Sequence, residues 1–135
     1  MAKKQFTKSI ARSTSKIYFE KAQDFYESMQ NSYDNQKWNT VGLTAVHCAI
    51  SLSDALLAYY GGIRNTNKDH KSAGELLKRY IQNEAIDQQE KRFAKIISKK
   101  NLIEYEGRVF TRKDADDIRK HTERFFIWTK EVLKI

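Results

Sequence analysis

Three polar residues share one face of a segment that is otherwise apolar. His47, Ser51 and Asp54 are spaced four and three residues apart within WNTVGLTAVHCAISLSDALLAYY, residues 38–60. On a helix this spacing places all three on one side. Buried polar groups need partners, so the stripe is either the floor of a polar site between helices or part of an internal network. In such a network His47 would bond to Ser51, and Asp54 would pair with a basic residue elsewhere.

Other residues that commonly carry chemistry are scattered along the chain. His47, His70, His121 and Cys48 occur singly, and no HxxxH or CxxC pair is present, so we predict no metal site. There is no GxSxG nucleophile motif, and apolar neighbours are expected to raise the pKa of the Cys48 thiol. The Gly-Gly pair at 61–62 lacks the Lys-Ser/Thr of a phosphate loop. We therefore expect no cofactor.

Basic residues in the second half of the chain have a spacing that suits phosphate. Lysines recur every four residues within 91–99, and an aromatic residue and more cations follow. Such a combination can hold phosphates and stack a base, which makes RNA or a nucleotide a candidate ligand. The same lysine spacing is also typical of a solvated helix face, and nearby acids would weaken the field. The residues concerned are Lys91, Arg92, Lys95, Lys99, Lys100, Tyr105, Arg108 and Arg112.

The net charge of +8 is concentrated at the N-terminus. Residues 1–16 carry five basic residues and no acid, which leaves +3 on the rest of the chain. We therefore divide the chain into a basic N-terminal arm, residues 1–15, and one domain, residues 16–135. The arm either contacts phosphate or is a solvated, frayed tail.

The elements that must position these residues are predicted to be helices. The 135 residues include no proline and five glycines, and the composition, 40% hydrophobic and 31% charged, is that of one globular domain. Apolar residues recur at spacings of three and four, which predicts one buried face per helix. Thr111 with Asp114 resembles a capping box, Asp69 or Asn67 can cap the third helix, and the glycines at 61–62 end the second. The predicted helices are 14–34, 38–60, 70–81, 86–104 and 112–134.

Four long helices and one short helix with short links predict an all-α, antiparallel up-and-down bundle. The second helix is apolar on nearly every side and is expected to be the central one. The predicted inward face of the first helix comprises Ile17, Tyr18, Ala22, Phe25, Tyr26, Met29 and Tyr33. Aromatic residues left on the surface would support self-association. The candidates are Trp38, Tyr59, Tyr60, Phe126 and Trp128.

The sequence also bears on the cellular setting. No window approaches 18 uninterrupted apolar residues, and the first residues lack the apolar core of a secretory signal, so we expect no membrane span. A single cysteine, Cys48, cannot form an internal disulfide. A reducing cytoplasm is the expected setting.

The order of these segments resembles the HEPN superfamily over residues 16–134. The resemblance is carried by YFEKAQDFYESM, WNTVGLTAVHCAISLSDALLAYYGG, DHKSAGELLKRY and FTRKDADDIRKHTERFFIWTKEVL. It implies an up-and-down helical bundle that commonly forms a homodimer. Many members are ribonucleases, often prokaryotic toxins paired with a nucleotidyltransferase antitoxin or parts of defence systems. Others are inactive and bind nucleotides, RNA or partner proteins.

Active HEPN members carry Arg, four to six residues, then His, often as Arg-Asn-x-x-x-His. The resemblance implies that the histidine acts as acid or base on RNA and the arginine holds phosphate, without a metal. Arg64 and His70 match the spacing but lie before the third helix, whereas the motif normally occurs later. There the chain reads Lys100-Asn101-Leu-Ile-Glu-Tyr105. Tyr titrates at about 10 and Lys lacks the bidentate fork, so this would be a ribonuclease motif without its catalytic pair.

Two hypotheses follow from the resemblance and the residues. The first is a non-catalytic HEPN-like module that binds RNA, a nucleotide or a partner protein. Its candidate binding residues are Lys100, Asn101, Tyr105, Arg108, Arg112, His47, Ser51 and Asp54. The second is a metal-independent ribonuclease with Arg64 and His70 as its catalytic candidates. The replacements at Lys100 and Tyr105 favour the first hypothesis.

Overall fold

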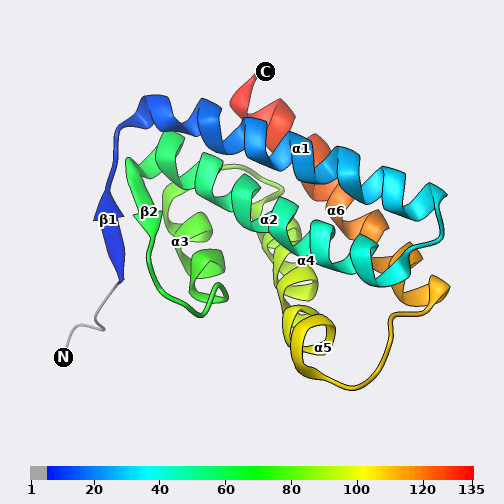
Figure 1. The fold of residues 1–135 in the computed structure, drawn as a ribbon. Helices are drawn as coiled ribbons and strands as arrows, with labels where there is room; N and C mark the ends of the chain where they lie inside the picture. Colours follow the sequence, from blue (N-terminus) through cyan, green and yellow to red (C-terminus); the bar gives the residue numbers. More distant parts are fainter. Residues whose placement is uncertain (1–5) are drawn as a thin grey trace.

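Six α-helices and a small β-ribbon make up residues 6–135, the part of the chain that the computed structural model describes (Figure 1). The predicted all-α bundle is confirmed. The two strands, which the sequence did not predict, are β1 Thr7–Ser9 and β2 Ile63–Asn65, and a 3-10 turn spans Arg12–Thr14. The helices are α1 Ser15–Asp34, α2 Trp38–Gly61, α3 Ser72–Tyr80, α4 Ile86–Ser98, α5 Lys100–Tyr105 and α6 Arg112–Leu133.

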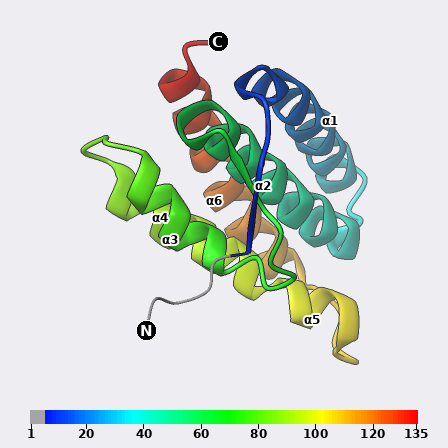
Figure 2. The same ribbon diagram turned by 90° about the vertical axis from the view of Figure 1, so that its left-hand side faces the viewer.

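Helix α2 lies at the centre of the bundle. It packs against α1 and α6 along its length and also contacts α3, α4 and α5 (Figures 1 and 2). By length and composition it could cross a membrane, with a mean hydropathy of 1.6 over its most apolar stretch, but 78% of that stretch is buried inside the domain. This is the pattern of a core helix, in which apolar side chains on all sides meet other helices. The predicted central position of this helix is confirmed.

The inward faces of α1 and α6 differ in part from the prediction. Ile17 was expected to face inward but is 53% exposed, and Phe19, two residues later, is buried instead and stacks on Phe126 at 5.5 Å. Phe126 and Trp128 were named as candidate surface aromatics, and both are buried; the apolar spacing of 112–134 also placed Phe126 on the inward face of that helix, and this is confirmed. The indole of Trp128 donates a hydrogen bond to Asn83 Oδ1 at 3.2 Å, so its polar atom is satisfied within the domain. These two residues therefore do not contribute the aromatic surface that was predicted.

The predicted helix 86–104 is two helices. Helix α4 ends at Ser98 because the amide of Lys99 donates to the carbonyl of Ile96, three residues back, at 3.1 Å. This tighter turn breaks the α-helical ladder, and α5 starts again at Lys100. The redirected α5 packs Leu102 and Ile103 against the core. The break matters for function because it places Lys100 at the start of a separate helix.

Part of the basic N-terminal arm is paired rather than frayed. Strand β1 is antiparallel to β2, with Lys8 opposite Arg64, and backbone bonds beyond the strands extend the pairing from Phe6 to Ile10. The turn that leads into β2 uses Gly62, which has φ of 59° and ends α2 as predicted. The frayed-tail alternative therefore does not describe residues 6–10. Residues 1–5, with two of the predicted cations, lie outside the described part of the chain.

The two predicted helix starts have different outcomes. The capping box at α6 is confirmed, because Thr111 Oγ1 accepts the amide of Asp114 at 3.1 Å and Asp114 Oδ2 accepts the amide of Thr111 at 2.9 Å. The predicted caps of α3 are wrong, because this helix begins after Lys71 without a side-chain cap. Asn67 and Asp69 instead shape the loop that precedes it.

Candidate functional site

The polar stripe on α2 lies beside the β-ribbon, and one of its two buried members is an acid. Ser51 and Asp54 are both buried. Asp54 Oδ2 lies 3.9 Å from Arg64 Nε on β2. Burial raises the pKa of Asp54 to about 6, and the positive charges of Arg64 and Lys21 oppose that shift. The expected pairing of Asp54 with a basic residue elsewhere is confirmed, and the partner is the arginine of the Arg-x5-His match.

The loop between β2 and α3 is shaped by three polar side chains at alternate positions. Asn65 Oδ1 accepts the amide of Asn67, Asn67 Oδ1 accepts the amide of Asp69, and Asp69 Oδ1 accepts the amide of Lys71, at distances of 3.0–3.2 Å. Each bond spans two residues, which is the local turn that Asn and Asp favour. The sequence NTNKD thus specifies the conformation of the loop that leads to His70, just before α3.

His70 lies in a largely positive environment. Burial lowers the pKa of His70, and the cation of Lys100 on α5 lowers it further. Asp69 raises the pKa, whereas His47 and Arg64 lower it. The imidazole is therefore uncharged at neutral pH and able to accept a proton. Strand β2 and the loop that follows it thus lie within electrostatic range of α5, which comes much later in the chain.

The first member of the α2 stripe, His47, packs against an aromatic ring. Its imidazole stacks on Phe25 of α1 with ring centroids 5.4 Å apart. The bond from His47 to Ser51 that the internal-network alternative required is not formed within residues 6–135. His47 therefore belongs to the surroundings of His70 rather than to a network within α2.

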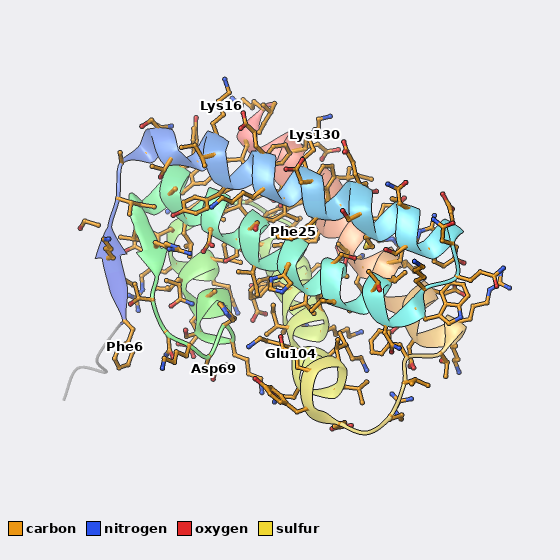
Figure 3. All side chains as sticks on the ribbon, in the orientation of Figure 1. Phe6, Lys16, Phe25, Asp69, Glu104 and Lys130 are labelled. Carbon is orange, nitrogen blue, oxygen red and sulfur yellow. The ribbon has the colours of Figure 1, made fainter. Side chains whose placement is uncertain are left out.

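Lys100 and Tyr105, the residues that stand in place of the family's Arg and His, lie at opposite ends of α5. Lys100 Nζ lies 3.9 Å from Glu104 Oε2 on the same helix, and its charge acts on His70. Tyr105, at the other end of α5, is 77% exposed, and Asn101 is exposed as well. Figure 3 shows Glu104 of α5 and Asp69 of the loop before α3 along the same lower side of the molecule.

The two arginines among the predicted binding residues, Arg108 and Arg112, lie near the start of α6. Arg108 Nη1 lies 3.3 Å from Asp114 Oδ2, so its charge is used at the capping box. The guanidinium of Arg112 lies 6.0 Å from the ring of Trp38. Nothing in the described contacts links these two arginines to His70. The predicted binding residues thus fall into two places, and we define the His70 cluster as Arg64, His70, Lys100 and His47.

Two residues of the cluster's surroundings were missed from the sequence. The ring of Tyr18 lies 5.4 Å below the guanidinium of Arg64, and Lys21 acts on the Asp54 carboxylate. Tyr18 was assigned to the inward face of the first helix, and it is in fact half-buried. Their spacing of three residues on α1 was the available signal, but the position of β2 over α1 was needed to interpret it.

The remaining chemistry of the domain is limited. Burial raises the pKa of the Cys48 thiol, as the sequence predicted, so this cysteine is a core residue rather than a nucleophile. Within residues 6–135 no group of three or more His, Cys, Asp or Glu side chains is placed to hold a metal ion. What the cluster can do is attract an anion through Arg64 and Lys100 and exchange a proton through His70.

Comparison with known protein families matches residues 15–132 to the family described as HEPN domain. The match covers the six helices almost from end to end. Among curated proteins and solved structures, no match was found.

Proposed function

Because the chain belongs to the HEPN domain family, we propose that it is a non-catalytic helical module that binds the phosphates of single-stranded RNA at the His70 cluster. The observation that carries this proposal is that Arg64 and Lys100 both lie within electrostatic range of His70. Two cations around an uncharged imidazole attract a phosphate and offer it hydrogen-bond donors. The exposed ring of Tyr105 on the same helix as Lys100 supplies a surface on which an unpaired base can stack.

We propose that the module is not catalytic for two reasons, which concern Arg64 and Tyr105. Arg64 shares its charge with the Asp54 carboxylate, so less of it is left to stabilise a transition state. At the late motif, tyrosine stands where active members carry histidine, and it lies in solvent. Asp54 contacts the cluster through Arg64 and is itself buried, which makes it a positioning residue rather than a direct contact of the ligand.

The second candidate function is a metal-independent ribonuclease. The specific observation in its favour is that the pKa of His70, near Arg64, is lowered. An uncharged imidazole is the form that can act as a general base. In this mechanism His70 would take the proton of a ribose 2′-hydroxyl, and Arg64 would hold the phosphate. We rank it second because Arg64 is paired with an acid.

One RNA experiment distinguishes the two functions. Labelled single-stranded RNA is incubated with the purified protein in EDTA, and its binding is measured by fluorescence anisotropy while a denaturing gel reports cleavage. Binding without cleavage, weakened by Lys100→Gln and by Arg64→Gln but not by Lys130→Gln, supports the proposal. Lys130 is a matched control because it lies on the upper side of the molecule, away from Asp69 and Glu104 (Figure 3). Cleavage that disappears in His70→Ala would establish the ribonuclease instead.

Two partners are proposed, namely a second copy of the chain and a nucleotidyltransferase. We infer a homodimer because HEPN domains commonly form homodimers. The exposed apolar side chains of Ile17, Leu43 and Ile127 could form contacts between two copies of the chain. Sedimentation equilibrium tests the dimer directly. Co-purification with a nucleotidyltransferase encoded beside this chain tests the toxin–antitoxin setting.

A further inference from the structure

A pocket at one end of the bundle shares no lining residue with the His70 cluster. It has a volume of about 470 Å³ and lies where the start of α1, the end of α2 and the end of α6 come together (Figure 2). This volume falls within the range of about 300–1,000 Å³ that is typical of small-molecule sites. The pocket is therefore large enough to hold a small organic molecule. Its lining residues are Arg12, Ser13, Ser15, Lys16, Tyr59, Leu133 and Ile135.

The walls of this pocket are mainly apolar. Leu133 and Ile135 contribute from the end of the chain, and Tyr59 contributes its ring from α2. The hydroxyl of Ser15, which also lines the pocket, donates a hydrogen bond to the carbonyl of Ala55 at 2.7 Å, so this polar group already has a partner. A ligand that occupies the pocket therefore needs a hydrocarbon body, which gains free energy by leaving water.

The two charged side chains of the pocket are both cations. Within residues 6–135 neither Arg12 nor Lys16 forms an ion pair with an acid. The guanidinium of Arg12 lies over the Tyr59 ring, 3.8 Å from its centre, and this contact holds it at the pocket. The N–H groups of a stacked guanidinium lie in its own plane and stay free to donate, and a carboxylate is the planar anion that accepts two of them in parallel. Figure 3 shows Lys16 near the start of α1, on the upper side of the molecule.

We propose that this pocket binds an amphiphilic carboxylate, a small molecule with a hydrocarbon chain and one carboxylate group, such as a medium-chain fatty acid. The chain packs against Leu133, Ile135 and the Tyr59 ring, and the carboxylate accepts hydrogen bonds from Arg12, with Lys16 adding positive charge. Charge complementarity selects this ligand, because the lining combines two unpaired cations with apolar walls and has no acidic side chain. An alkylammonium has the same chain but the wrong charge, and a nucleotide would place its polar sugar against hydrocarbon. The proposal does not rest on the function assigned to the His70 cluster.

The test titrates the full chain with octanoate and follows binding by isothermal titration calorimetry and by methyl NMR. We expect saturable binding that shifts the methyl signals of Leu133 and Ile135. Octylammonium, which has the same chain and the opposite charge, is expected to leave these signals in place. Each methylene removed between octanoate and hexanoate should weaken binding about fourfold, the effect of one buried CH₂ group. Attraction to surface charge alone would show no such dependence on chain length.

Two variants with an equal change of charge test the role of the arginine. Arg12→Gln should weaken octanoate binding about tenfold, because the charge-assisted hydrogen bonds to the carboxylate are lost. Lys37→Gln removes an exposed cation at the opposite end of α1 and α2 and should leave the affinity within twofold. The proposal is overturned when octanoate does not bind, when octylammonium binds equally well, or when the two variants weaken binding equally. Unchanged helical circular dichroism shows that each variant is folded.

Discussion

The guanidinium of Arg64 lies 3.9 Å from the carboxylate of Asp54, and this pair joins strand β2 to the buried part of α2. The side chain of Asp54 is 11% exposed, whereas that of Arg64 is 50% exposed. The arginine therefore presents one side to the core and the other to solvent, where a ligand can reach it. The pair holds the start of the loop that carries His70, so the electrostatics of α2 and the geometry of the candidate site are linked.

The Asp54 carboxylate should make stability depend on pH. Its pKa is raised from 3.8 to about 6 by burial, so the folded state favours the protonated acid. The stabilisation is complete below about pH 4 and is lost as the pH rises through about 6. We expect Asp54→Asn to be more stable relative to wild type at pH 8 than at pH 4, by roughly 1–3 kcal/mol. Urea unfolding at both pH values measures this, with the exposed Asp24→Asn as control. An equal difference at pH 4 and pH 8 would contradict the assignment.

His70 should respond to a charge on a different helix. Lys100 is the largest electrostatic influence on its pKa after burial and lowers it. We expect Lys100→Gln to raise the titration midpoint of His70, because the imidazolium then meets one cation fewer. An NMR pH titration of the imidazole signal measures this shift, and Lys130→Gln should leave the midpoint in place. If Lys100→Gln has no effect, α5 does not lie against the loop before α3.

Gly42 should be intolerant of a side chain. A Cβ at this position would lie 2.7 Å from Phe110 Cε2 and 2.9 Å from Ile103 Cδ1. We expect Gly42→Ala to lower the free energy of unfolding by about 1–3 kcal/mol through overpacking. Thermal or urea unfolding checks this, and Gly107→Ala is the matched control, because a Cβ there meets nothing within 4 Å. Equal stability of the two variants would show that α5 and Phe110 do not pack closely on α2.

The capping box at α6 should contribute measurably to stability. Thr111 Oγ1 accepts the amide of Asp114, and Thr111→Ala leaves that amide without its partner. We expect a loss of about 1 kcal/mol in the free energy of unfolding. Urea unfolding of Thr111→Ala beside Thr66→Ala, an exposed threonine in the loop after β2, provides the comparison. A loss of the same size in both variants would mean that the cap does not stabilise the domain.

Features that depend on residues close together in the chain could be predicted from the sequence. The apolar periodicity predicted four of the helices closely, since the burial of one face follows from side-chain spacing alone. The capping box at Thr111 and the end of α2 at Gly62 were also readable, because caps depend on neighbouring residues. Within the site, the α2 stripe and the need of Asp54 for a cation were predicted. The spacing of Arg64 and His70 made them catalytic candidates, but the sequence did not show which side chains surround them.

The sequence by itself thus determined an all-α HEPN domain and a list of candidate residues. Tertiary structure decided which of them meet, because loop and ribbon contacts join residues with no fixed spacing along the chain. Strand β2, which pairs with β1, places Arg64 beside Asp54, and α5, which follows the break after Ser98, brings Lys100 within electrostatic range of His70. The same packing buried Phe126 and Trp128 and set Arg12 over the ring of Tyr59. Electrostatic sites of this kind depend on distance in space, which helical periodicity does not encode.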